Sequence, residues 1–328
     1  MRSALALARH VLGYRVSPAA DSAHDRFRGC LLGLAIGDAV GTTLEFMRPG
    51  TFEPITDMNG GGPFGLPAGA WTDDTSMALC LAESLVDRGG FDARDQMDRY
   101  VRWYRQGYLS STGTCFDIGN TTRAALERFE RTREPFAGDS DPSTAGNGSI
   151  MRLAPVAMYY ARTPFEAIAR CAESSRTTHG AVAAVDGCRL LGAIIVHLLN
   201  GAEKSEVLSD QHAPPAEPWA ARALCPKVAD IASGSFKRKA PPEIRGTGYV
   251  IQSLEAALWA FHRSESFRDG CLIAANLGED ADTTAAVYGQ IAGAWYGGSA
   301  IPEAWLARLS KRGTIERLAD GLSQKAEP

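Results

Sequence analysis

Two acidic clusters, one early and one late in the sequence, hold the side chains best suited to metal chemistry. Each combines two aspartates with a threonine at the expected N-terminus of a helix: Thr72, Asp73 and Asp74 in the first, and Asp280, Asp282 and Thr283 in the second. One Thr or Asp is enough to cap a helix, whereas adjacent carboxylates repel each other unless a cation lies between them. Carboxylate and hydroxyl oxygens are the ligands that Mg²⁺ and Mn²⁺ prefer. Capping explains either cluster alone, but the two together favour a metal site.

The summed charge of the clusters predicts two divalent cations. Four aspartates facing one cavity would carry about four negative charges, and a single dication would compensate only half of them. We therefore expect two Mg²⁺ or two Mn²⁺ ions, each held by one aspartate pair or bridged by both pairs. Zinc is disfavoured because the six histidines show no paired ligand spacing and no cysteine cluster accompanies them.

Apolar residues recur at helical spacing along almost the whole chain, and no convincing run of alternating β-branched residues predicts a strand. The sequence therefore predicts an all-α fold. The first helix carries glycines at four-residue spacing (Gly29, Gly33, Gly37 and Gly41), which would let another backbone approach closely and makes this helix central. The expected helices span residues 27–46, 72–86, 91–104, 119–131, 150–160, 164–175, 179–199, 249–261, 267–277 and 281–296.

One domain is expected over residues 25–328, because apolar helices lie on both sides of the one long polar segment. That segment, residues 201–247, contains six prolines and the basic run Lys237-Arg238-Lys239, and we interpret it as a variable, partly ordered surface insertion. Residues 1–24 would form an N-terminal extension. Arg9 and His10 interrupt its apolar run, so a frayed or docked amphipathic helix is favoured over a secretory signal.

The composition argues against several classes of partner. With 34 Lys and Arg against 38 Asp and Glu, the formal net charge is -4, and the basic residues are scattered, so a nucleic-acid partner is not expected. The most apolar stretch, residues 180–199, contains Asp186, Arg189 and His197, which argues against a membrane span. The seven cysteines form no CxxC pair and are expected to be reduced, mostly core residues of a cytoplasmic protein.

The acidic clusters belong to a longer series of motifs in a fixed order: Gly33 to Ala39 leading to Glu45-Phe46, Gly60 to Gly62, Thr72 to Thr75, Phe116 to Gly119, Gly146 to Arg152, Thr178-His179, Gly248 to Val250, and Asp280 to Thr283. This series resembles the ADP-ribosylglycohydrolase family, and within it the bacterial arginine-specific branch, over residues 27–296. The resemblance implies a single orthogonal helical domain. It also implies a binuclear magnesium or manganese centre with Thr72, Asp73, Asp74, Asp280, Asp282 and Thr283 as its ligands.

The resemblance places two further carboxylates, Glu45 and Asp117, beside the metal centre. Cleavage of an N-glycosidic bond passes through an oxocarbenium-like state, which needs a nearby negative charge, a base for water and fixed ribose hydroxyls. We hypothesise that Asp117 assists attack at the anomeric carbon and that Glu45 orients or deprotonates the water. A solvated helix end is the alternative for Glu45. Asp117 is expected to be functional because an unpaired acid between Phe116 and Ile118 would be costly.

The implied substrate-binding residues are Gly146, Asn147, Gly148, Ser149, Met151, His179, Gly248 and Tyr249. The segment Gly146 to Ser149 would expose backbone N–H groups at a helix N-terminus, which suits a diphosphate, although the motif taken alone is more often an ordinary turn. His179 could instead be a helix-start histidine with one hydrogen bond. Tyr249 could stack on adenine or simply belong to the core.

The function implied by the resemblance is hydrolysis of the N-glycosidic bond of ADP-ribosylated arginine on a protein, which reverses mono-ADP-ribosylation. The expected partner is the modified protein and, for an immunity member of the family, a cognate ADP-ribosyltransferase toxin. Non-enzymatic ADP-ribose binding or occlusion of a toxin is the main alternative. A serine or nucleobase linkage is a smaller one. The segment Asp280 to Thr284 also allows a haloacid-dehalogenase-like phosphatase, which would require a buried strand before Asp280.

Overall fold

The computed structural model describes residues 22–209 and 223–326. These residues form α-helices, three short 3-10 helices and isolated β-bridges, with no named strand among them. In chain order the elements are α2 (Ala23–Gly41), η1 (Thr42–Leu44), α3 (Asp73–Arg88), α4 (Ala93–Gln106), α5 (Asn120–Thr132), η2 (Pro142–Thr144), α6 (Ala154–Tyr159), α7 (Pro164–Arg176), α8 (Val182–Leu199), α9 (Lys204–Val207), α11 (Pro226–Ala232), α12 (Ser235–Arg238), α13 (Val250–Arg263), α14 (Phe267–Ala275), α15 (Ala281–Tyr296), η3 (Gly298–Ala300), α16 (Glu303–Arg308) and α17 (Arg312–Ala326). The predicted all-α fold is confirmed.

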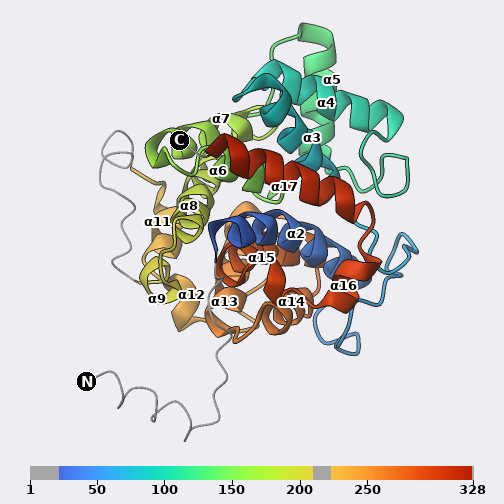
Figure 1. The fold of residues 1–328 in the computed structure, drawn as a ribbon, viewed down its shortest axis with the longest axis vertical. Helices are drawn as coiled ribbons and strands as arrows, with labels where there is room; N and C mark the ends of the chain where they lie inside the picture. Colours follow the sequence, from blue (N-terminus) through green and yellow to red (C-terminus); the bar gives the residue numbers. More distant parts are fainter. Residues whose placement is uncertain (1–21, 210–222, 327–328) are drawn as a thin grey trace, which may run out of the picture.

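An antiparallel pair, α2 and α15, lies at the centre of the molecule (Figure 1). The glycine series of α2 faces small residues of α15, with Gly29 against Gly293, Gly33 against Gly289 and Gly37 against Ala285. Because neither helix has a side chain at the Gly33 and Gly29 crossings, the two backbones lie in direct contact. This antiparallel contact brings the C-terminal end of α2 to the N-terminal end of α15.

Replacing Gly33 by Ala tests this contact. The added methyl group would overlap the carbonyl oxygen of Gly289, which is backbone and cannot rotate away. We expect the free energy of unfolding to fall by about 1–3 kcal/mol or more, as in overpacked cores. Gly313→Ala is the matched control, because it also lies in a helix but nothing stands within 4 Å of its added methyl group. Urea unfolding should show the control to be neutral or slightly stabilised.

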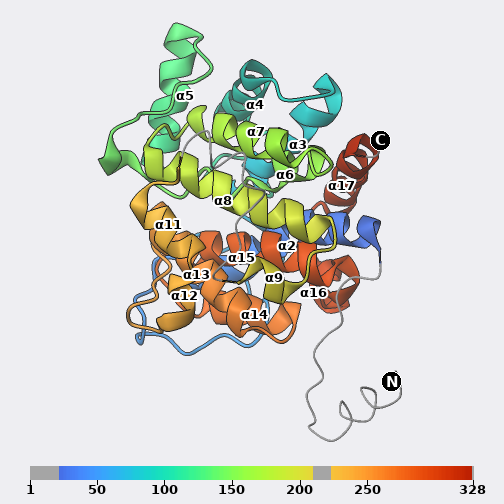
Figure 2. The ribbon, with the colours of Figure 1, turned by 90° about the vertical axis from the view of Figure 1, so that its left-hand side faces the viewer.

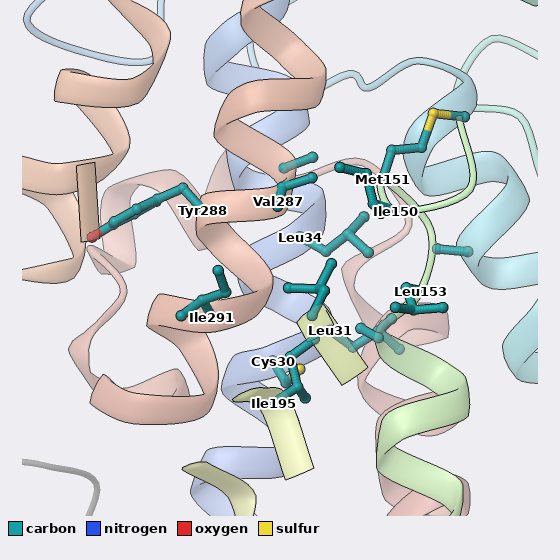
Figure 3. Packing of buried hydrophobic residues seen from close by; sticks show 14 of the residues in the cluster. Cys30, Leu31, Leu34, Ile150, Met151, Leu153, Ile195, Val287, Tyr288 and Ile291 are labelled. Atoms are coloured by element: carbon teal, nitrogen blue, oxygen red, sulfur yellow. The ribbon is translucent and has the colours of Figure 1, made fainter. Parts of the chain in front are cut away.

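Two groups of helices cover the central pair from opposite ends of the molecule. Helices α3, α4 and α5 gather at one end, α13, α14 and α16 at the other, and α17 lies alongside α2 (Figures 1 and 2). Helix α8 packs against α6, α7, α13 and α15, which joins the two groups. In the core, Leu34 of α2, Val287 of α15, Ile150 and Leu153 belong to one cluster of buried hydrophobic residues (Figure 3).

Each predicted helix is present, but several ends differ. The helix predicted from residue 150 begins only at Ala154, because Ile150 to Arg152 form a turn. The helix predicted from residue 179 begins at Val182. Helices α16 and α17 were not predicted, although α17 has buried Ile315, Leu318 and Leu322 at helical spacing.

The described parts of the predicted insertion, 201–209 and 223–247, are more ordered than expected. They contain α9, α11 and α12, and Val228, Ile231 and Phe236 are buried. Lys239 Nζ donates to Glu255 Oε1 of α13 at 2.7 Å, so the described part of the segment from 223 to 247 is docked against α13. Residues 210–222 of the insertion lie outside the described residues, as do residues 1–21 of the predicted N-terminal extension.

Among the described residues, two helical stretches, Ala23–Leu44 and Val182–Leu199, are long and apolar enough to span a membrane by length and composition alone. In the fold, 89% and 83% of these windows are buried, as is typical of core helices. All seven cysteines are free, and five of them are buried, which agrees with the expected reduced core residues; Cys115 and Cys225 are half-buried.

Candidate active site

A cavity of about 370 Å³ opens where the N-termini of α3, α5 and α15 converge. We call it the acidic pocket, because five aspartates and a glutamate contribute to its wall. Its lining residues are Glu45, Phe46, Asp73, Asp74, Asp117, Ile118, Gly119, Asn120, Thr121, Thr122, Gly146, Asn147, Gly148, Met151, His179, Gly248, Asp280, Asp282 and Thr283. The convergence of helix N-termini and carboxylates around one cavity favours a site that uses cations.

The two acidic clusters, separated by about two hundred residues in the sequence, face each other in this pocket. Thr72 Oγ1 lies 3.2 Å from Asp282 Oδ2, and Thr283 Oγ1 lies 3.4 Å from Asp74 Oδ2. Each of these contacts joins the tip of α3 to the tip of α15. The structure thus brings together all six residues predicted as metal ligands.

The two clusters contain more acceptor oxygens than hydrogen-bond donors, as expected for a site that binds a cation. The Thr72 hydroxyl, which has one hydrogen, has three carboxylate oxygens within reach: Asp38 Oδ1 at 3.0 Å, Asp282 Oδ2 at 3.2 Å and Asp74 Oδ2 at 3.4 Å. Asp74 Oδ1 is buried and has no hydrogen-bond partner. Oxygens of Glu45, Asp280 and Asp282 lie within 4.8 Å of one another. A hard divalent cation would give Asp74 Oδ1 a partner and would offset the negative charge of the other carboxylates.

Burial and mutual repulsion raise the pKa of the clustered carboxyls. Burial is the main cause for Asp73, Asp74 and Asp282, whose pKa values lie well above the usual range. Neighbouring negative charges raise these pKa values further. The largest such effect comes from Asp117 on Asp73, from Asp38 on Asp74, and from Glu45 on Asp282. Such a group of acids is stable in ionised form only when a positive charge is added.

Asp38, inside α2, supports the first cluster and was not predicted as a site residue. Its Oδ1 accepts from the Thr72 amide at 2.9 Å, and its Oδ2 accepts from the Thr75 amide at 3.0 Å and the Thr75 hydroxyl at 2.6 Å. Burial raises the pKa of Asp38 to about 6 against these hydrogen bonds. The sequence did contain a signal, since an acid within an apolar helix needs buried partners.

Glu45 follows η1 and reaches the start of α15. Its Oε2 accepts from the Ala281 amide at 2.8 Å and the Asp282 amide at 3.3 Å, so Glu45 caps a helix that is distant in sequence. The side chain is buried, which contradicts the alternative of a solvated helix end. Burial, together with the charge of Asp280, raises the pKa of Glu45 to about 8.

Asp117 is half-buried in the loop before α5 and adopts a φ of 60°. A non-glycine residue in this left-handed region is uncommon and typical of functional sites. Burial raises the pKa of Asp117 to about 7, while a hydrogen bond with Asp282 opposes the shift. The neighbouring Phe116 ring lies 5.3 Å from that of Phe64. Asp117 lines the same pocket as the two acidic clusters but lies in the loop before α5, outside their helix tips.

Metal-free protein should lose stability as the pH rises. The pKa is raised to about 6 for Asp38, to about 7 for Asp117 and to about 8 for Glu45. At a pH above the usual carboxyl pKa but below these values, the three carboxyls are protonated in the folded protein and ionised in the unfolded chain, so the folded protein binds more protons. These carboxyls therefore make the free energy of unfolding fall as the pH rises; the lowered pKa of His179 opposes this slope only below the usual histidine pKa, so the fall is expected from about 7 to about 8. Urea unfolding in EDTA should show this slope, and saturating Mg²⁺ should reduce it. A metal-free stability that increases over this range would contradict the arrangement.

Gly146, Asn147 and Gly148 line the pocket, but the segment Gly146 to Ser149 does not form the predicted helix N-terminus. The Asn147 amide donates to Gly248 O at 3.0 Å, and Asn147 Nδ2 donates to Asp280 Oδ2 at 3.2 Å. Helix α6 begins later, at Ala154. Ser149 is buried away from the pocket, where its hydroxyl accepts from Ser175 at 3.0 Å. The segment is therefore a turn tied to residue 248 and to the second acidic cluster.

The other predicted substrate-binding residues differ in position. Met151 and Gly248 line the pocket. Tyr249 is half-buried outside the lining, and its hydroxyl lies 3.1 Å from Lys227 Nζ. His179 lines the pocket and lies before the first residue of α8, so it is not a helix-start histidine. Burial, together with the charge of Arg152, lowers the pKa of His179 to about 3, so its imidazole is neutral at pH 7. Lining residues that were not predicted are Phe46, Ile118, Gly119, Asn120, Thr121 and Thr122.

A comparison with models of protein families identifies the family of this chain. The model described as ADP-ribosylglycohydrolase matches residues 19–328. The chain belongs to the ADP-ribosylglycohydrolase family. The predicted family is confirmed, and the match extends beyond residue 296, so helices α16 and α17 are part of the ADP-ribosylglycohydrolase domain.

Individual members of the ADP-ribosylglycohydrolase family resemble this chain over most of its length. The ADP-ribosylarginine hydrolase Tri1 of Pseudomonas putida (strain GB-1) is 49% identical over 93% of this chain and 80% of its own. The ADP-ribosyl-(dinitrogen reductase) glycohydrolase of Rhodospirillum rubrum is 30% identical over 90% of this chain and 93% of its own. A solved structure described as an ADP-ribosylglycohydrolase-related protein complex is 44% identical, with a TM-score of 0.82 over 94% of this chain and 100% of that one.

The ADP-ribosylglycohydrolase fold also contradicts the phosphatase interpretation of Asp280 to Thr284. A haloacid-dehalogenase-like nucleophile follows a buried strand, whereas Asp280 follows helix α14 and precedes helix α15.

Proposed function

We propose that this chain is a metal-dependent hydrolase that removes ADP-ribose from arginine side chains of a modified protein. Family membership and two relatives named as ADP-ribosylarginine hydrolases, at 49% and 46% identity, support this activity. The observation that carries the proposal is the meeting of both acidic clusters in one pocket with Glu45 and Asp117 beside them. The pocket therefore holds both a cation site and the acids that glycosidic cleavage needs.

We propose two Mg²⁺ or Mn²⁺ ions, held by Thr72, Asp73, Asp74, Asp280, Asp282 and Thr283. Two dications would balance the ionised aspartates, and oxygen ligands suit these metals. When bound, the ions would supply the positive charge that orients ribose hydroxyls and a water.

The protein groups have separate tasks in this mechanism. Asp117, half-buried beside Asp282, stabilises positive charge at the anomeric carbon and assists the attack. Glu45, fixed by the Ala281 and Asp282 amides, orients or deprotonates the water. Asp38 holds Thr72 and so keeps the first cluster in place.

Hydrolysis is favoured over simple ADP-ribose binding, because both clusters, Glu45 and Asp117 are present and converge on one pocket. The linkage to arginine, as opposed to serine or a nucleobase, is supported by the names of the relatives. A cognate toxin partner and a cytoplasmic location stay predictions. Residues 1–21 of the predicted extension 1–24, which could contact a toxin, lie outside the described residues.

The deciding experiment is incubation of the full chain with a peptide carrying ADP-ribosyl-arginine, in Mg²⁺, in Mn²⁺ and in EDTA. We expect release of free ADP-ribose with either ion and none in EDTA. A peptide with ADP-ribosyl-serine should be cleaved more slowly. Release in EDTA at the same rate would contradict a metal-dependent mechanism, and binding without release in all conditions would favour the non-enzymatic alternative.

A further inference from the structure

Arg152, in the turn before α6, is a fully buried arginine without an acidic partner. Its exposed fraction is 0%, and no carboxylate of the described residues forms an ion pair with it. Nη1 donates to Gly148 O at 2.9 Å, Nη2 donates to Thr178 Oγ1 at 2.6 Å, and Nε has no hydrogen-bond partner. The guanidinium also lies 4.7 Å from the centre of the Tyr100 ring. A buried cation with only neutral partners is costly unless an opposite charge is supplied from elsewhere.

The contacts of Arg152 lead to one part of the acidic pocket wall. The Arg152 guanidinium donates directly to the carbonyl oxygen of Gly148, and it is connected to His179 through the hydroxyl of Thr178. Gly148 and His179 both line the pocket. A side chain at Gly148 would overlap the His179 ring, so this turn lies directly against the imidazole. The positive charge is therefore placed behind the pocket wall, where it is screened from water but acts on a bound ligand.

The hydrogen bonds from Arg152 also fix the tautomer of His179. Thr178 Oγ1 accepts from Arg152, and His179 Nδ1 lies 2.8 Å from the same oxygen. The Thr178 oxygen has a second lone pair and could also accept from an Nδ1–H, but the buried Thr178 hydroxyl hydrogen would then have no acceptor among the described residues. The imidazole therefore accepts at Nδ1 and carries its own hydrogen on Nε2, the nitrogen next to Gly146 and Gly148.

We propose that Arg152 is a positioning residue for the anionic diphosphate of the substrate: its buried charge attracts the diphosphate, and through Thr178 it turns His179 into a fixed Nε2–H donor at the pocket wall. The inference deepens the proposed function and rests on it for the identity of the ligand. A neutral imidazole held as a donor fits an oxygen of a phosphate, and the ligand supplies the negative charge that Arg152 lacks within the protein.

The test compares Arg152→Lys with Arg152→Met in the full chain. Lysine keeps the charge and methionine removes it with a similar unbranched stem. Isothermal titration with ADP-ribose in Mg²⁺ should show binding weakened about tenfold or more in R152M and less than about threefold in R152K. Titration with Mn²⁺ alone should give the wild-type affinity in both variants. Equal ADP-ribose affinity in R152M and wild type would overturn the proposal.

Gln290→Met is the matched control, because Gln290 is equally buried and supports the same turn without a charge. Its Nε2 donates to Ile150 O at 3.0 Å and Met151 O at 2.8 Å. Thermal unfolding should show Q290M to be destabilised, with ADP-ribose affinity preserved in the folded protein. If Q290M weakens ADP-ribose binding as much as R152M does, Arg152 acts only by supporting the turn.

The tautomer is measured independently by the ¹⁵N shifts of the His179 ring, assigned with a His179→Gln variant. Wild-type protein should show the Nε2–H form at neutral pH, and R152M should show a mixture of tautomers. An Nδ1–H form in the wild type would overturn the relay even if R152M does not fold. Binding and tautomer are both read without hydrolysis, so a protein that binds ADP-ribose but does not cleave it would contradict the proposed function and leave this inference standing.

Discussion

Replacing Asp282 by Asn is expected to lower hydrolysis of ADP-ribosyl-arginine by at least about 10³-fold and to remove the tight binding of Mn²⁺. Asp282 stands at the meeting point of both clusters, 3.2 Å from Thr72 Oγ1, and belongs to the group with Glu45 and Asp280. Loss of a metal that contributes several kcal/mol at the reacting centre corresponds to such a factor. Single-turnover rates and Mn²⁺ titration are the measurements.

The same variant should be more stable than wild type when metal is absent. Burial and the charges of Glu45 and Asp74 raise the pKa of Asp282, so its ionised form destabilises the metal-free fold near neutral pH. Asp95→Asn is the control, because Asp95 is a buried acid outside the pocket whose oxygens accept from Arg88 and Arg99 at 2.7 Å. D95N should be less stable with and without metal and should keep its metal affinity. A D282N protein that binds Mn²⁺ normally would remove Asp282 from the metal site.

Replacing Asp117 by Asn should reduce turnover by about 10²–10⁴-fold, the usual contribution of an acid or base at a reacting centre, while metal affinity stays near that of wild type. The reason is position: Asp117 borders the pocket from the loop before α5 and interacts with Asp282, but it lies outside the two helix tips that carry the predicted ligands. Steady-state kinetics and Mn²⁺ titration separate the two effects.

Asn120→Ala is a matched control for D117N, since Asn120 is exposed at the start of α5 and lines the same pocket without a titratable group. We expect it to alter KM more than kcat. Wild-type turnover in D117N would exclude Asp117 from the chemistry, and loss of Mn²⁺ binding in D117N would place Asp117 among the metal ligands.

The sequence alone was sufficient for features that depend on local pattern. The helical spacing of apolar residues predicted the all-α fold and α15 with its observed bounds. The glycines of α2 predicted a close helix contact, which the structure forms with α15. Two aspartates with a threonine at a helix start were recognisable as chemistry, because capping requires only one of them.

Other features could be decided only by the tertiary structure, because they depend on contacts between distant residues. Local pattern cannot reveal that Glu45 caps α15, that Asp38 holds Thr72, or that Ser149 turns away from the pocket. Long-range packing also placed the segment 223–247 against the core, where its prolines had suggested a surface loop. A side chain's partners are set by the whole fold, and so are its burial and its charge state. The aspartates and threonines of the two clusters were therefore enough to predict a metal site from the sequence. Which of their oxygens share one cavity was determined by the contact between α2 and α15.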